Sequence, residues 1–108
     1  MVTIRIAKQK IRNLVSDLRD SGYNPSRAVL FGSVAKQRAH RFSDIDVAIW
    51  DSKFIGCAPF DYEPILKILR PYTGLELHTF NSSETAESNP FIGEIDKHGL
   101  EIDLSQLT

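Results

Sequence analysis

Apolar and polar positions alternate along the chain in patterns whose period changes several times. Between residues 2 and 20 the apolar side chains recur every three or four positions, which predicts an amphipathic helix with one side in a core. Two short apolar runs, 28–32 and 44–50, predict buried strands, and alternation over 75–80 predicts a third strand. The apolar stripe of the predicted helix consists of Ile4, Ala7, Ile11, Leu14, Val15 and Leu18.

Shorter segments between these strands carry helix signals. Residues 34–40 have room for one or two helical turns, and residues 62–70 predict a helix capped by Asp61. A further amphipathic helix is expected over 89–99, followed by a short strand within 100–104. This order of helices and strands predicts an α+β fold in which a small sheet has helices packed on one face.

Length and composition agree with one folded domain over residues 1–108. The chain is 42% hydrophobic and 25% charged, which is usual for a globular protein. Its net charge of −1 argues against attachment to nucleic acid or to an anionic membrane by bulk electrostatics. Cys57 is the one cysteine, and no apolar stretch approaches the roughly 20 residues that span a bilayer. We therefore expect a cytoplasmic protein that binds neither nucleic acid nor membrane.

Asp44 and Asp46 open the second predicted strand. Residues two apart on a strand point the same way, with Cα atoms about 6.6–6.8 Å apart, so their carboxylates can converge to about 4 Å. At that separation two negative charges repel by roughly 4 kcal/mol at an effective dielectric constant of 20. A divalent cation such as Mg²⁺ removes this repulsion, which makes the pair a candidate metal site. The alternative is that both aspartates face water, where their charges are screened.

Gly32 and Ser33 directly follow the first predicted strand. Glycine lets the backbone approach a ligand closely, and a serine that opens a helix offers its hydroxyl and nearby N–H groups to a phosphate. By itself the pair also fits an ordinary turn with a helix cap. Ten residues separate Ser33 from Asp44, enough for a short helix and a return loop, so a phosphate site and the carboxylates can meet at one edge of the sheet. Ser43 is placed to orient the first aspartate.

Glu76 lies between two leucines on the third predicted strand and shares its face with His78. Either residue also fits the water-facing side of an alternating strand. Beside Asp44 and Asp46, Glu76 would complete a trio of carboxylates. Such a trio can hold two cations about 3.5–4 Å apart, which activate an attacking hydroxyl and stabilise a leaving pyrophosphate.

These motifs together resemble the nucleotidyltransferase superfamily that includes DNA polymerase beta, in its smallest, single-domain form. The residues that carry the resemblance are Gly32-Ser33, Asp44-Ile45-Asp46 ten residues later, and Leu75-Glu76-Leu77. The resemblance implies a palm-like fold built on a small mixed sheet. It also implies an enzyme that uses Mg²⁺, in a two-metal site, to transfer a nucleoside monophosphate (AMP from ATP) to an acceptor hydroxyl with release of pyrophosphate.

The resemblance further implies particular residues and partners. The nucleotide-binding residues are Gly32, Ser33, Lys36 and Ser43, and the catalytic and metal-binding residues are Asp44, Asp46 and Glu76. Minimal members often pair with a small all-helical HEPN-domain protein as toxin and antitoxin, and some add AMP to a tyrosine of that partner. Because a domain this small has little surface with which to choose an acceptor, we expect a partner protein or a second copy of the chain to complete the site.

The chain departs from the family pattern at three positions. Val34 and Gln37 stand where a basic residue and a glycine are common, and Glu76 stands where the third acid is usually aspartate. A second hypothesis follows from these departures: a non-catalytic, antitoxin-type module that neutralises a helical HEPN-type toxin by contact.

Overall fold

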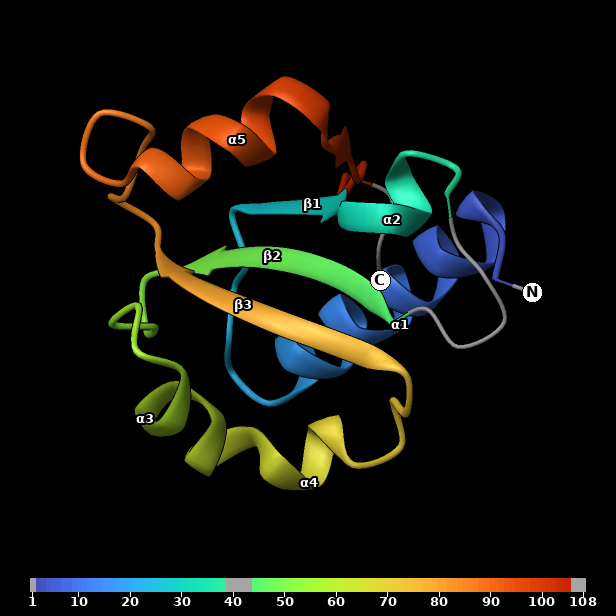
Figure 1. The fold of residues 1–108 in the computed structure, drawn as a ribbon. Coiled ribbons are helices and arrows are strands. Elements are labelled where there is room, and N and C mark those ends of the chain that lie inside the picture. Colours follow the sequence, from blue (N-terminus) through green and yellow to red (C-terminus); the bar gives the residue numbers. More distant parts are fainter. Residues whose placement is uncertain (1, 39–43, 106–108) are drawn as a thin grey trace.

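The computed structural model of the chain describes residues 2–38 and 44–105 (Figure 1). Among these residues, four strands form one sheet in the order β3-β2-β1-β4. Strand β1 (Arg27–Phe31) is antiparallel to both β2 (Ile45–Asp51) and β4 (Leu100–Glu101), whereas β2 is parallel to β3 (Leu75–Asn81). The predicted strands and the mixed character of the sheet are confirmed.

The helices predicted over 2–20 and 89–99 begin and end close to the predicted positions, whereas the shorter helices differ from the predicted ranges 34–40 and 62–70. Helix α1 (Ile4–Asp20) starts after Thr3, whose hydroxyl accepts a hydrogen bond from the Ile6 N–H. The helical turn after β1 is the short α2 (Gly32–Ala35). Between β2 and β3 the chain forms α3 (Ala58–Tyr62), a 3₁₀ turn (Glu63–Ile65) and α4 (Leu66–Leu69); α5 (Pro90–His98) precedes β4.

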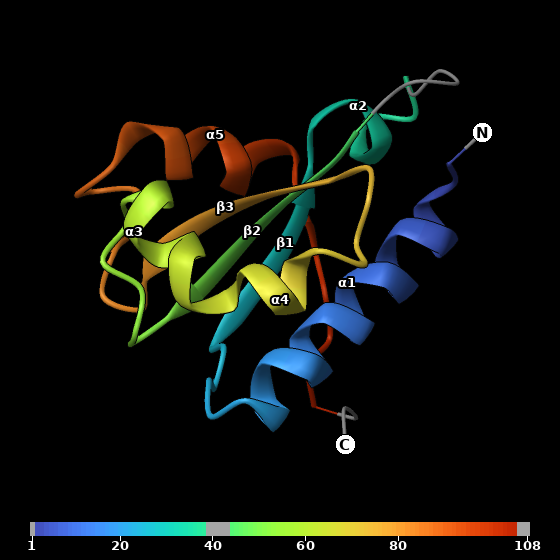
Figure 2. The ribbon, with the colours of Figure 1, turned by 90° about the horizontal axis from the view of Figure 1, so that it is seen from below.

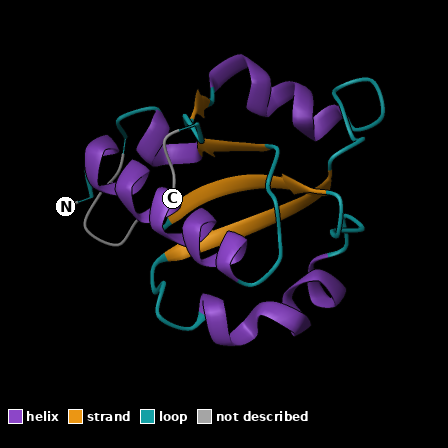
Figure 3. Ribbon diagram, turned by 180° about the vertical axis from the view of Figure 1, so that it is seen from behind, coloured by secondary structure: helices purple, strands orange, loops and turns teal. Residues whose placement is uncertain are grey.

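The sheet has a hydrophobic cluster on each face. Alternate residues of the strands, such as Val47 and Ile49, pack with the buried stripe of α1. Their neighbours Ala48 and Trp50 pack with Ile92 and Ile95 of α5 on the opposite face. Figure 2 shows the strands between α1 and α5, and Figure 3 shows α1 running across its face of the sheet.

The helices therefore do not all pack on one face, and that part of the sequence prediction is wrong. The physical reason lies in the central strand β2, whose side chains are apolar on both faces over residues 47–50. A strand of this kind needs cover on both sides. Helix α5 provides the second cover. Near the starts of β2 and β3 this cover is incomplete, since the side chains of Asp46 and Glu76 are partly exposed.

The predicted role of Asp61 as the cap of a helix over 62–70 is wrong, because α3 has already begun at Ala58. The buried carboxylate of Asp61 instead accepts hydrogen bonds from the backbone N–H groups of Ile55, Gly56 and Cys57 at 2.8–3.0 Å, and from the Thr79 hydroxyl at 2.7 Å. These bonds fasten the loop before α3 to β3.

Replacing Asp61 with alanine should lower the free energy of unfolding by about 2–4 kcal/mol, because buried donors would lose their acceptor. Asp61→Asn keeps one acceptor oxygen and should cost less. Urea denaturation of both variants measures the difference. Equal stability of wild type and Asp61→Ala would show that the loop does not depend on this carboxylate.

Among the described residues, no helix combines the length and the apolar character that crossing a lipid bilayer requires.

Candidate metal and nucleotide site

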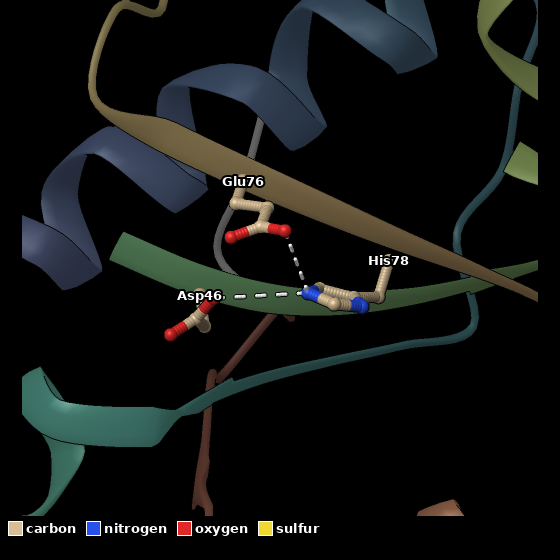
Figure 4. A group of neighbouring side chains, drawn as sticks. All are labelled: Asp46, Glu76 and His78. Carbon is tan, nitrogen blue, oxygen red and sulfur yellow. Dashed lines mark ion pairs between the residues drawn. The ribbon is translucent and has the colours of Figure 1, made fainter. Parts of the chain in front are cut away.

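The register of the sheet brings two of the predicted acids together. Asp46 on β2 pairs directly with Glu76 on β3, and on its other side Asp46 pairs with Phe31, the last residue of β1. Paired residues of neighbouring strands point to the same face, and such strands lie about 4.8 Å apart. Carboxylate oxygens of Asp46 and Glu76 and a ring nitrogen of His78 all lie within 4.8 Å of one another. Figure 4 shows the three side chains converging on one point.

Gly32 borders this cluster from the end of β1. Its φ of +75° lies in the left-handed region that favours glycine. A Cβ atom at this position would stand 2.3 Å from Oδ2 of Asp46. The absence of a side chain at Gly32 is therefore what lets the turn after β1 lie directly against the carboxylate.

Asp44 occupies a different place from its partner in the motif. It is exposed, it precedes the first residue of β2, and it does not belong to the three-residue cluster found among the described residues. It lines a hollow of about 290 Å³ together with Glu76 and Tyr72. Glu76 therefore belongs both to the Asp46 cluster and to the lining of the Asp44 hollow. The role of Asp44 as a metal ligand stays a prediction.

Three of the four predicted nucleotide-binding residues, Gly32, Ser33 and Lys36, lie at the same turn. Ser33 is half-buried in α2, and Lys36 is exposed at its end, where it lines a hollow of about 150 Å³ with Gly32 and Phe91. Lys36 is thus a positive charge beside the glycine turn. Ser43 lies outside the described residues. The binding roles of these four residues stay predictions.

Gln37 shows how the chain keeps the shape of the turn without the family's glycine. Its φ of +57° places it in the left-handed region, where a side chain costs roughly 1–2 kcal/mol. The backbone conformation that suits glycine is therefore present at this position although the side chain has changed.

The electrostatics of the cluster favour a bound cation. Burial and then the neighbouring charge of Glu76 raise the pKa of Asp46 above its ordinary value, while His78 acts in the opposite direction. Nε2 of His78 is buried and has no hydrogen-bond partner among the described residues. Two carboxylates and one unpartnered imidazole nitrogen are suitable ligands for a divalent metal, so the residues present fit such an ion.

From the sequence, His78 was expected on the face of Glu76, either in contact with a substrate or as an ordinary surface histidine, and not as a metal ligand. The signal was the two-residue period of β3, which puts both side chains on one face. What the sequence did not contain was the register, and only the register sets His78 close to Asp46 as well.

Fold and site together define a nucleotidyltransferase-class domain: a mixed sheet with a Gly-Ser turn set against an Asp–Glu pair on adjacent strands. The chain belongs to the polymerase beta nucleotidyltransferase family, since the family described as "Polymerase beta, Nucleotidyltransferase" matches residues 9–107. Among solved structures, the chain is similar to one described as a toxin-antitoxin with AMP-PNP. That similarity has a TM-score of 0.64 and 24% identity, and it covers 92% of this chain and 74% of that chain. No curated protein matches the sequence.

Proposed function

We propose that this chain is a Mg²⁺-dependent nucleotidyltransferase that transfers AMP from ATP to an acceptor hydroxyl and releases pyrophosphate. The observation that carries the proposal is the direct pairing of Asp46 with Glu76 across β2 and β3, with Gly32 against the Asp46 carboxylate. At one edge of the sheet, the two acids can hold the metal ion that neutralises a triphosphate, and the glycine turn can bind its phosphates.

The site residues divide into two groups by chemistry. Asp46 and Glu76, with Asp44 beside them, would hold the metal, and Gly32, Ser33 and Lys36 would contact the phosphates, with Ser43 completing the motif. When bound, Mg²⁺ neutralises charge on the triphosphate and on the leaving pyrophosphate.

The chemical step requires one bond to form and one to break at the α-phosphorus. The acceptor oxygen attacks this atom, and the bond to the bridging oxygen breaks, so that pyrophosphate leaves with the electron pair. The acceptor proton needs a base at the surface of the site. Glu76 suits this role because its side chain is 56% exposed, compared with 24% for Asp46.

The nature of the donor and the acceptor is part of the same proposal. The similar structure described with AMP-PNP supports an adenine nucleotide as donor, and its description as a toxin-antitoxin supports a protein partner. We propose a helical partner of the HEPN type that carries the acceptor hydroxyl; a second copy of the chain is the alternative way of completing the site.

The same similarity supports a second candidate function, an antitoxin module that neutralises its partner by contact alone. The two candidates differ in what Asp46 must do. A contact module retains neutralisation in the Asp46→Asn variant, whereas neutralisation by nucleotidyl transfer is lost with the acid.

Labelled ATP tests the proposed reaction. The chain is incubated with Mg²⁺ and its helical partner, in one reaction with ATP labelled at the α-phosphate and in another with label at the γ-phosphate. We expect covalent label on protein from the α-phosphate alone, because pyrophosphate carries the γ-label away. Label from the γ-phosphate would indicate phosphoryl transfer instead. The absence of both labels, together with no heat of MgATP binding in calorimetry, would contradict the enzyme.

A further inference from the structure

His78 places a nitrogen atom at the centre of the carboxylate cluster. Its Nε2 lies 3.7 Å from an oxygen of Asp46 and 3.9 Å from an oxygen of Glu76. The atom is buried, and neither distance is a hydrogen bond, so it has no such partner within the described residues. A buried polar atom of this kind is costly unless something else satisfies it.

Aromatic packing sets the direction of the His78 ring (Figure 4 shows the ring edge facing the two acids). Phe31 contacts the ring in a T-shaped arrangement with centroids 4.9 Å apart, and Phe91 does the same at 5.7 Å. Because β3 holds the backbone and two phenyl rings hold the side chain, Nε2 points at the carboxylates before any ligand arrives.

We propose that His78 Nε2 is a ligand of the same ion that Asp46 and Glu76 hold, and that it makes this site prefer a first-row transition-metal ion to Mg²⁺. The inference rests on the proposed function only in requiring a metal at this cluster. Mg²⁺ takes oxygen ligands and keeps its waters, whereas an imidazole nitrogen favours the transition metals. The acids of the motif do not provide this selectivity by themselves.

The two distances from His78 Nε2 to the carboxylates are compatible with one ion. Ligand atoms about 2.1 Å from a metal are separated by about 3.0 Å at a right angle and by about 4.2 Å on opposite sides. The separations of 3.7 and 3.9 Å from Nε2 fall between these limits. The competing explanation is a protonated His78 that simply pairs with two carboxylates, and this explanation requires no metal.

Electron paramagnetic resonance with Mn²⁺ as the probe separates the two explanations, using nucleotide-free protein. We expect His78→Gln to weaken Mn²⁺ binding by about 10-fold or more, and to change Mg²⁺ binding, measured by calorimetry, by less than about 3-fold. Pulsed spectra of the wild type should show coupling between Mn²⁺ and an imidazole nitrogen, and His78→Gln should lose it. His98→Gln is the matched control, since His98 lies on α5 outside the cluster, and it should behave as wild type.

Unchanged Mn²⁺ affinity in folded His78→Gln, or equal weakening of Mn²⁺ and Mg²⁺, would overturn the inference. Circular dichroism tests whether the variant is folded. If His78→Gln binds Mn²⁺ as wild type does while Asp46→Asn does not, the assignment of His78 fails and the proposed metal site stands. If the wild type binds neither ion, with or without ATP, both fail.

Discussion

Replacing Asp46 with asparagine should lower nucleotidyl transfer by about 10³-fold, because a bound metal contributes several kcal/mol of charge stabilisation and each 1.36 kcal/mol is tenfold in rate. Asp46 has a neighbour on each side: Glu76 pairs with it from β3, and Gly32, directly after β1, lies against its carboxylate. Asparagine keeps the size of the side chain and removes the charge that the metal requires. Transfer of α-label from ATP and binding of Mn²⁺ measure the two effects.

The same substitution should leave the fold without metal at least as stable as wild type at neutral pH. Burial and Glu76 raise the pKa of Asp46 in the folded chain. A carboxyl with a raised pKa contributes stability that is fully present below its unfolded pKa and lost as the pH rises through the folded value. At neutral pH the ionised Asp46 therefore opposes folding, and removing its charge relieves the repulsion.

Asp20→Asn is the control, since Asp20 is an exposed acid at the end of α1, and it should leave transfer, metal binding and melting temperature unchanged. If Asp46→Asn melts more than about 4 °C below wild type, Asp46 supports the fold. In a domain of this size, a shift of about 4 °C corresponds to about 0.5–1 kcal/mol. If Asp46→Asn transfers the α-label at the rate of wild type, Asp46 has no part in the mechanism.

Replacing Gly32 with alanine should reduce both transfer and metal affinity by about 100-fold or more and also destabilise the fold. An alanine at φ +75° costs about 1–2 kcal/mol from the backbone alone. Its Cβ would stand 2.3 Å from the Asp46 carboxylate, so that carboxylate has to leave its position beside Glu76. Such a displacement of a catalytic group by about 1 Å can cost about 10²-fold in rate.

Gly74→Ala separates these two effects. Gly74 has almost the same φ, +78°, but a Cβ there would meet no atom within 4 Å. We expect this control to lose the same backbone cost of about 1–2 kcal/mol and to keep the Mn²⁺ affinity of wild type. Thermal melting and Mn²⁺ titration of both variants give the comparison. An equal, small effect of the two substitutions on Mn²⁺ affinity would mean that Gly32 serves the turn and not the carboxylate.

Much of the fold could be read from local patterns. The stripe of α1 is buried at Ala7, Ile11 and Leu14, because a 3.6-residue period puts these side chains on one side of a helix. The alternation of β3 likewise predicted a strand with Glu76 on one face. The continuous apolar run of β2 indicates cover on both faces, which contradicts the prediction of helices on one face, and α5 supplies the second cover.

By itself, the sequence determined which residue types stand at the turn and on the strands, and so which family the chain belongs to. The tertiary structure alone decided which of them meet: Asp46 pairs with Glu76, Gly32 leaves room for the carboxylate, His78 joins the cluster and Asp44 lies in the neighbouring hollow. The physical reason is the range of the forces involved. Periodicity and turn chemistry act between residues close in the chain, whereas register depends on packing between strands that lie some thirty residues apart in the sequence.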